Sequence, residues 1–358
     1  MDFLALAFIL LLLIGIRFAP RGQFFDDNSS KDSFRMLKGI MVLIIVLEHI
    51  HLYTLGGGLY KILFGMPLLF VSVFLFMSGY GLQFSFQRTH GAYLNGYLYR
   101  RYPKVLLPYL FAFLLTLAGY LLAGVPVDAS QIMPSFVNGV PFVKFSWYVI
   151  AILFFYLAFF LIYRFAPRGR KTLLALFLAA YIAACYFLGY GTWWYNSCLS
   201  FLLGVCWAER ETDITHFLKK RYYLKLVACG VLLAGFCALS YLSKNPLVVL
   251  FGNLCATLLL PSFFMILTMK VKFSNPVLGL LGTISFELYL LQGLPMEALR
   301  GGRIYISNNV LYAVAVLISA VALAFLLNCA DSYLLGKYSL FLSRREKKKS
   351  SRKAKPTK

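Results

Sequence analysis

The chain has 358 residues, of which 61% are hydrophobic and only 13% are charged, and its mean hydropathy is +0.76. A soluble globular protein carries about 25% charged residues, so this composition excludes an ordinary water-soluble enzyme. The apolar runs are continuous over about 17–25 residues, which favours membrane-spanning α-helices over the alternating ten-residue strands of a β-barrel. We therefore predict an all-α polytopic membrane protein.

The net charge of +22 does not indicate a nucleic-acid-binding protein. Most Lys and Arg residues stand in short clusters between apolar runs, a pattern typical of loops that set membrane topology. The concentrated basic block is the C-terminal RREKKKSSRKAKPTK, which we predict to be a disordered tail near anionic lipid headgroups. The seven cysteines are scattered through apolar segments without a CxxC pair, so neither a disulfide framework nor a metal site is predicted.

Apolar runs and the breaks between them predict about eleven transmembrane helices. They lie at about 2–18, 37–54, 62–84, 104–124, 146–164, 171–189, 192–208, 223–242, 247–269, 277–296 and 309–336. The first run follows Asp2 and precedes Arg17 and Arg21, without a small-residue cleavage site. This arrangement indicates a retained first span rather than a secretion signal.

The distribution of positive charge predicts the orientation of these spans. If the C-terminal tail is cytoplasmic, 30 of the 35 Lys and Arg residues fall on the cytoplasmic side, and the excess alternates from loop to loop. Positive residues concentrate in cytoplasmic loops. We expect a multi-pass protein of the cell membrane with its N-terminus outside and its C-terminus in the cytoplasm.

The second span, RMLKGIMVLIIVLEHIH, carries ionisable residues at membrane depth. His49 follows Lys38 by eleven residues, which is about 16 Å along a helix and only about 20° beyond three full turns. The two side chains are therefore predicted on one helix face, with Lys38 at the cytoplasmic mouth and His49 near the middle of the membrane. Glu48 lies about 100° around the same helix.

Three other spans bring polar groups to a similar depth, namely Ser78, Tyr156 and Glu287. Ionisable groups inside a bilayer cost several kcal/mol (~3 at the centre of a helix) and usually face the bundle interior or a wet cavity. Structural alternatives remain open, because Ser78 and Tyr156 also suit helix packing and Glu48 also suits pairing with His51. Arg300 and Arg303, in a predicted outer loop, suit either an acidic acceptor or lipid headgroups.

The motifs around these residues resemble those of the acyltransferase-3 family of bacterial membrane O-acyltransferases. The resemblance rests on LKGIMVLIIVLEH, FLFMSGY, YLYRRYPKVLLPYL, SWYVIAILFFYLAF and TISFELYLLQ, which follow one another in the family's order from about 36 to 292. Two positions differ from the common pattern. Lys38 stands where arginine is common, and Gln292 stands where histidine is common and cannot act as an acid or base.

The resemblance implies a ten-helix core plus one extra N-terminal span. We therefore expect three regions: an extra helix and polar connector at 1–35, an acyltransferase-like membrane domain at 36–338, and the basic tail at 339–358.

The resemblance also implies transfer of an acyl group from cytoplasmic acyl-CoA, acetyl-CoA in particular, to a hydroxyl of an extracytoplasmic glycan or lipid-linked sugar, without a permanently bound cofactor. His49 would be the general base, Glu48 or Glu287 would orient its ring, and Tyr156 or Ser78 would stabilise the oxyanion. The donor's phosphates would meet Lys38, Arg100, Arg101 and Lys104.

A transporter or flippase is the alternative, with a proton relay through Glu48, His49, His51 and Glu287.

Overall fold

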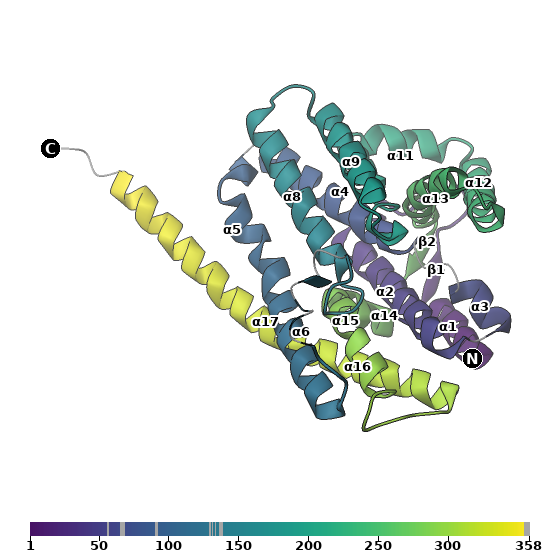
Figure 1. The fold of residues 1–358 in the computed structure, drawn as a ribbon. Coiled ribbons are helices and arrows are strands. Elements are labelled where there is room, and N and C mark those ends of the chain that lie inside the picture. Colours follow the sequence, from purple (N-terminus) through teal and green to yellow (C-terminus); the bar gives the residue numbers. More distant parts are fainter. Residues whose placement is uncertain are drawn as a thin grey trace.

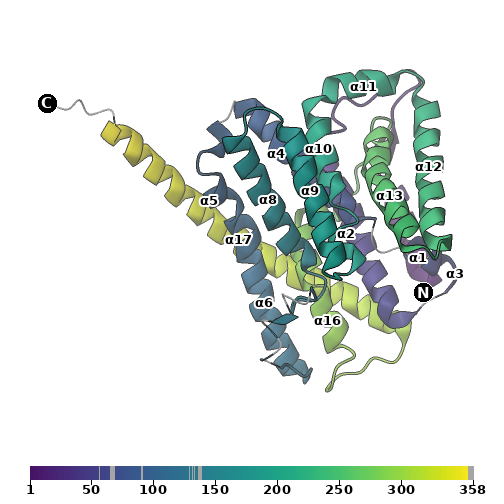
Figure 2. The ribbon, with the colours of Figure 1, turned by 45° about the horizontal axis from the view of Figure 1, so that its top comes forward.

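The structure is a computed structural model that describes residues 1–55, 57–64, 69–89, 92–128, 130, 132, 134–135 and 139–353. Helices pack side by side into a bundle, and the last helix, α17, projects well beyond it (Figures 1 and 2). The first half of the chain forms α1 (Asp2–Leu13), α2 (Lys31–Thr54), α3 (Gly58–Phe64), α4 (Val71–Thr89), η1 (Ala92–Leu94), α5 (Tyr97–Arg101), α6 (Pro103–Ala123), α8 (Trp147–Phe165) and α9 (Arg170–Phe187).

The second half continues with η2 (Thr192–Trp194), α10 (Leu199–Glu209), α11 (Glu211–Lys219), α12 (Tyr222–Leu242), α13 (Pro246–Leu267), α14 (Pro276–Thr283), α15 (Ser285–Leu291), α16 (Gly293–Ala298) and α17 (Asn309–Lys353). Two short strands, β1 (Ile16–Phe18) and β2 (Val271–Phe273), pair antiparallel. The all-α class is confirmed apart from this one small pair.

Among the described residues, seven helices are long and apolar enough to cross a membrane: α2, α6, α8, α9, α12, α13 and α17. The broken segment α14–α16 would make an eighth. All seven coincide with predicted spans, so the membrane class is confirmed, whereas four of the eleven predicted spans have a different form.

The predicted first span, 2–18, is a helix of 12 residues followed by extended chain. Such a helix is about 18 Å long, less than the ~30 Å hydrocarbon core of a bilayer. The helix ends at Leu13, Ile14 is already extended, and Gly15 turns the chain with φ +78°. The next residues pair with β2 instead. Asp2 accepts a hydrogen bond from the Tyr60 backbone N–H at 2.9 Å, while Asn275 Nδ2 donates to the Leu11 carbonyl oxygen at 2.9 Å. This segment therefore lies beside α3 and the start of α14.

The predicted span 62–84 is divided between α3 and α4, with residues 65–68 outside the described part of the chain. The predicted span 192–208 is the short η2 and the 11-residue α10. The backbones of α4 and α10 touch, because a Cβ added to Gly79 would lie 2.0 Å from the Phe201 carbonyl oxygen, and one added to Gly204 would lie 2.0 Å from that of Phe76. Small residues permit such contacts between membrane helices.

The predicted span 277–296 is bent by 67° between α14 and α15. α14 runs antiparallel to α2 in backbone contact with it, since Cβ atoms added to Gly39 and Gly282 would overlap the carbonyl oxygens of Leu278 and Arg35. After the bend, α15 and α16 lie along α2, with Gln292 beside His49 and Glu297 beside Tyr53. The bend carries Glu287 and Gln292 into the bundle.

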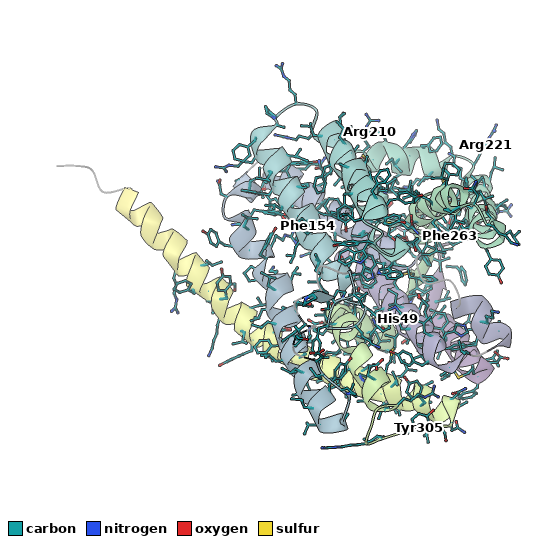
Figure 3. All side chains as sticks on the ribbon, viewed as in Figure 1. His49, Phe154, Arg210, Arg221, Phe263 and Tyr305 are labelled. Atoms are coloured by element: carbon teal, nitrogen blue, oxygen red, sulfur yellow. The ribbon has the colours of Figure 1, made fainter. Side chains whose placement is uncertain are left out.

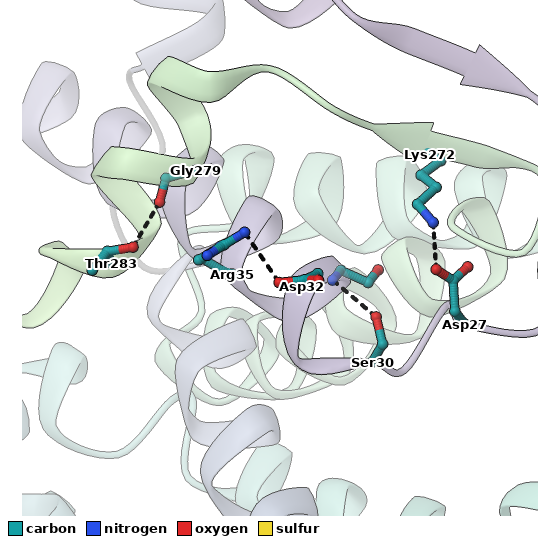
Figure 4. Close-up of polar contacts among 8 residues, drawn as sticks. Asp27, Ser30, Asp32, Arg35, Lys272, Gly279 and Thr283 are labelled. Atoms are coloured by element: carbon teal, nitrogen blue, oxygen red, sulfur yellow. Dashed lines mark hydrogen bonds and ion pairs between the residues drawn. The ribbon is translucent and has the colours of Figure 1, made fainter.

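The start of α2 is held by polar contacts of the preceding connector (Figure 4). Ser30 is the N-cap, and its hydroxyl accepts from the Ser33 N–H at 3.1 Å. Asp32 pairs with Arg35 at 3.0 Å, and Asp27 pairs with Lys272. N-caps of this type stabilise a helix end by ~1 kcal/mol, so α2 begins at Lys31, earlier than the predicted residue 37.

The last helix, α17, has 45 residues. It starts beside the C-terminal end of α2, where Asn309 Nδ2 donates to the Thr54 carbonyl oxygen at 3.2 Å. It continues as a helix to Lys353, through the first part of the segment predicted to be a disordered tail. Residues 354–358 lie outside the described part of the chain.

Candidate active site

A cavity of about 820 Å³ opens among α2, α4, α6, α8 and α15. Among the described residues that line it, Glu287 is the carboxylate and five side chains are cationic. The cations are Lys31, Lys38, Arg88, Arg101 and Lys104. We call the end of the bundle at which α2 begins the basic end, and the opposite end, at Thr54, the far end. A cavity with this excess of cations attracts an anionic ligand.

Arg101 is held at the cavity by Tyr93, to whose hydroxyl its Nε donates at 2.7 Å. Burial raises the pKa of both the Tyr93 and the Tyr97 phenols. These neighbours therefore stay neutral, and Arg101 keeps its positive charge for a ligand.

Two predicted donor-binding residues differ in position. Arg101 lines the cavity, whereas Arg100 donates through Nη2 to the Tyr93 carbonyl oxygen at 2.8 Å and is not part of the lining. Consecutive residues on a helix point about 100° apart, so only one of the pair faces the cavity. Arg88 takes the other place in the lining, although it is not among the donor-binding residues expected from the sequence.

The inner wall of the cavity is built of hydroxyl groups. Ser78 Oγ lies 3.2 Å from the Tyr148 hydroxyl, and the Tyr148 ring meets the Tyr289 ring edge-on with centroids 5.8 Å apart. Tyr156 lies in the same lining. The structure thus brings the predicted Ser78 and Tyr156 into one cavity. Tyr148 and Tyr289 were missed, although both belong to the motifs SWYVIAILFFYLAF and TISFELYLLQ.

The imidazole of His49 is oriented by Gln292. Gln292 is fully buried, and its Nε2 donates to the Tyr289 carbonyl oxygen at 3.0 Å. This bond turns the amide oxygen Oε1 towards His49 Nδ1, 3.0 Å away. An amide oxygen accepts hydrogen bonds, so Nδ1 carries the proton and Nε2 is the unprotonated nitrogen. Figure 3 places His49 inside the bundle, where α2 passes α15.

Phe145 connects this imidazole to the wall of the cavity. Its ring stacks on His49 with centroids 3.7 Å apart and an interplanar angle of 9°, and its carbonyl oxygen accepts from the Tyr289 hydroxyl. Tyr289 lines the cavity, whereas His49 does not. Phe145 also has φ +66°, a left-handed conformation that is rare for a bulky residue and concentrates at functional sites.

The two predicted carboxylates do not reach His49. Glu48 points to another side of α2, is 2% exposed, and neither of its oxygens has a hydrogen-bond partner among the described residues. Glu287 lines the cavity near Lys38 and accepts from Asn328 Nδ2 at 3.1 Å. It precedes Gln292 by five residues, about 7.5 Å along a helix. We expected one of these carboxylates to orient the imidazole; in the structure, Gln292 orients it instead.

Comparison with known proteins identifies the family. No curated protein and no solved structure matches the chain. A family model described as an acyltransferase domain matches residues 31–329. The match excludes α1 and β1 and includes the cavity and the His49 environment. The chain is therefore a multi-pass membrane protein that belongs to the acyltransferase-3 family.

Proposed function

We propose that the protein is an O-acyltransferase that moves an acyl group, in the first instance acetyl, from acyl-CoA at the basic end to a hydroxyl of a glycan or lipid-linked sugar at the far end. The observation that carries this proposal is the relation between the cavity and His49. Five cations line the cavity. Its lining residue Tyr289 donates to the carbonyl oxygen of Phe145, whose ring stacks on an imidazole of defined tautomer. We also propose that the basic end faces the cytoplasm.

The cationic mouth suits the donor, because CoA carries several phosphate charges on a long, narrow arm. Arg88, Arg101 and Lys104 would bind the phosphates by charge-assisted hydrogen bonds. Lys38 lies deeper, on the face of α2 that leads towards His49. The thioester would then arrive beside the hydroxyls of Ser78, Tyr148 and Tyr156, which are placed to donate to an oxyanion.

The chemistry requires an acceptor hydroxyl within reach of His49 Nε2. This nitrogen takes the hydroxyl proton while the oxygen attacks the thioester carbonyl carbon. The new C–O bond forms, the C–S bond breaks, and the sulfur leaves as a thiolate that receives the proton from the imidazolium. The products are an ester and the free CoA thiol, and Phe145 and Tyr289 must shift for the thioester to reach the imidazole.

The test is release of CoA thiol from acetyl-CoA by purified protein in detergent, with and without candidate glycans. His49→Ala is expected to lower transfer by about 10³-fold or more, the usual scale for loss of a catalytic base. His51→Ala, two residues nearer the far end and on another side of α2, is the matched control and should retain activity. Near-normal transfer by a well-inserted His49→Ala protein would refute the role of His49. Proton-driven flux without thiol release would instead support the transporter.

A further inference from the structure

Beyond His49, towards the far end, three polar side chains form a compact cluster that the mechanism above does not use. The Tyr53 hydroxyl donates to Glu297 Oε1 at 2.5 Å. Lys144 Nζ forms an ion pair with the same oxygen and also lies 3.3 Å from the Tyr53 hydroxyl. We call these three residues the far-end triad.

Each member of the far-end triad comes from a segment that either carries His49 or contacts its ring. Tyr53 follows His49 by four residues on α2, which is one turn and about 6 Å on the same face. Lys144 directly precedes Phe145, whose ring stacks on His49. Glu297 lies on α16, five residues after the Gln292 that bonds to Nδ1. The triad therefore forms the next layer above the imidazole.

The far-end triad is accessible. The side chains of Lys144 and Glu297 are 43% and 23% exposed. An ion pair this exposed contributes only about 0–1 kcal/mol to stability, so a role in holding the fold explains it poorly. Both bonds to Glu297 use Oε1, which leaves Oε2, among the described residues, to accept a hydrogen from a ligand.

Arg300 bonds to the protein beside the far-end triad and holds the backbone at Tyr53. It donates through Nη1 to the Tyr53 carbonyl oxygen and through Nη2 to Asn309 Oδ1 at 2.5 Å. Its guanidinium lies over the Tyr312 ring, 4.1 Å from the centroid. Arg303 likewise donates to the Leu122 carbonyl oxygen at 2.9 Å. Binding of an acidic acceptor was one alternative for these two arginines. Because both of them bond to other parts of the protein, the structure does not favour that alternative.

We propose that Tyr53, Lys144 and Glu297 form the acceptor site, and that it takes a neutral compound with neighbouring hydroxyls, such as an uncharged sugar. This inference rests on the proposed function. A sugar hydroxyl both donates and accepts; Glu297 Oε2 and the Tyr53 oxygen can accept from it, and Lys144 can donate its remaining N–H to it. The Lys144 ammonium and the Glu297 carboxylate cancel each other's charge. An acceptor with its own carboxylate therefore gains no net electrostatic attraction here and is repelled by Glu297.

The experiment measures acetyl transfer from acetyl-CoA to methyl glucoside and to methyl glucuronide, a matched neutral and anionic pair. Glu297→Gln and Lys144→Met are each expected to raise the KM for methyl glucoside about tenfold or more, the scale of one lost charge-assisted hydrogen bond. The KM for acetyl-CoA and its slow acceptor-free hydrolysis should stay within about twofold of wild type. Lys244→Met, an exposed lysine between α12 and α13, is the control and should change neither.

Tyr53→Phe removes one oxygen atom and provides a second test if a charge variant fails to insert; its KM for methyl glucoside should rise severalfold. Unchanged acceptor KM values in variants that still consume acetyl-CoA would overturn the acceptor site. Acetylation of the glucuronide in preference to the glucoside, or of neither sugar by a wild type that hydrolyses acetyl-CoA, would overturn the neutral class. A wild type that consumes no acetyl-CoA contradicts the proposed function itself.

Discussion

An amide partner and a carboxylate partner act differently on an imidazole. A carboxylate both orients the ring and stabilises the imidazolium, as in serine-protease triads. Gln292 fixes the position of the proton on Nδ1 but adds no charge to the bundle interior. In a chain whose nearby carboxylates, Glu48 and Glu287, do not reach His49, this amide is what keeps Nε2 available as a base.

Gln292→Leu tests this role at the scale of one residue. Leucine keeps the approximate shape and removes the acceptor, so the ring loses its fixed tautomer. We expect kcat to fall about 10- to 100-fold, the range observed when a supporting hydrogen bond is removed, with both KM values unchanged. Gln292→His, which can still accept from Nδ1, should recover part of kcat. Wild-type kcat in a well-inserted Gln292→Leu protein would contradict the assignment.

The sequence predicted the residue types at the site better than their contacts. Lys38, Ser78, Tyr156 and Arg101 could be selected because polar groups at membrane depth are rare and therefore informative. The sequence identifies Gln292 as a position without acid–base ability that suits an interhelical hydrogen bond, but it does not show which side chain the amide meets. The choice between Arg100 and Arg101 likewise depends on how α5 is rotated against α8, which tertiary packing decides.

At the scale of elements, glycine contacts determine how closely α4 and α10 approach. Gly79 and Gly81 both belong to the SGYG stretch of α4, yet only Gly79 meets a backbone: an added Cβ at Gly81 has no atom within 4 Å. The two glycines of this stretch therefore have different physical roles.

Gly79→Ala is expected to lower the thermal unfolding temperature in detergent by several degrees or to prevent insertion. Its Cβ would lie 2.0 Å from the Phe201 carbonyl oxygen, and overpacking costs about 1–3 kcal/mol. Gly81→Ala is the matched control and should be neutral or stabilising, since alanine favours a helix by ~1 kcal/mol over glycine. Equal unfolding temperatures for the two variants would show that α4 and α10 are not in backbone contact.

At the scale of elements, we also expect Phe145 to act as a barrier between the donor cavity and the imidazole. Phe145→Ala removes the stacked ring, so we expect faster acceptor-independent hydrolysis of acetyl-CoA, because water and thioester then reach His49 together. Phe145→Gly opens the same space and also relieves the left-handed backbone, which favours glycine by about 1 kcal/mol. Its unfolding temperature should therefore exceed that of Phe145→Ala. Hydrolysis no faster than wild type in both variants would exclude a barrier role.

The spans were predicted well where a helix is uniform and poorly where it is interrupted. A hydropathy pattern detects runs that are both long and apolar, and α6, α8, α12 and α13 are such runs. The 67° bend before α15 follows from contact between α14 and α2, which is a property of two segments far apart in sequence. The early end of α1 has the same origin, because its continuation pairs with β2.

At the scale of the whole molecule, the cations of the cavity gather at one end. Arg88→Ala and Arg101→Ala, which line the cavity, should each raise the KM for acetyl-CoA about tenfold with little change in kcat, because charge-assisted bonds to phosphate contribute about 1.5–3 kcal/mol. Arg100→Ala is the internal control and should have the smaller effect, since Arg100 bonds to the Tyr93 carbonyl outside the lining. An equal effect of all three would show that general positive charge, and not the cavity, attracts the donor.

One-sided placement of these cations also predicts that the donor is accepted from one face of the membrane only. α17 begins at the far end beside Thr54 and passes Glu287 at Asn328, so the basic C-terminal tail leaves the bundle at the basic end. In sealed proteoliposomes, trypsin added outside should cleave the tail only of molecules whose basic end faces outwards. Acetyl-CoA added outside should be consumed in proportion to that fraction, because the thioester cannot cross the bilayer to the other molecules. Consumption that is independent of the cleaved fraction would mean that the donor also enters from the far end, and the path from the cationic cavity to His49 would then have to be abandoned.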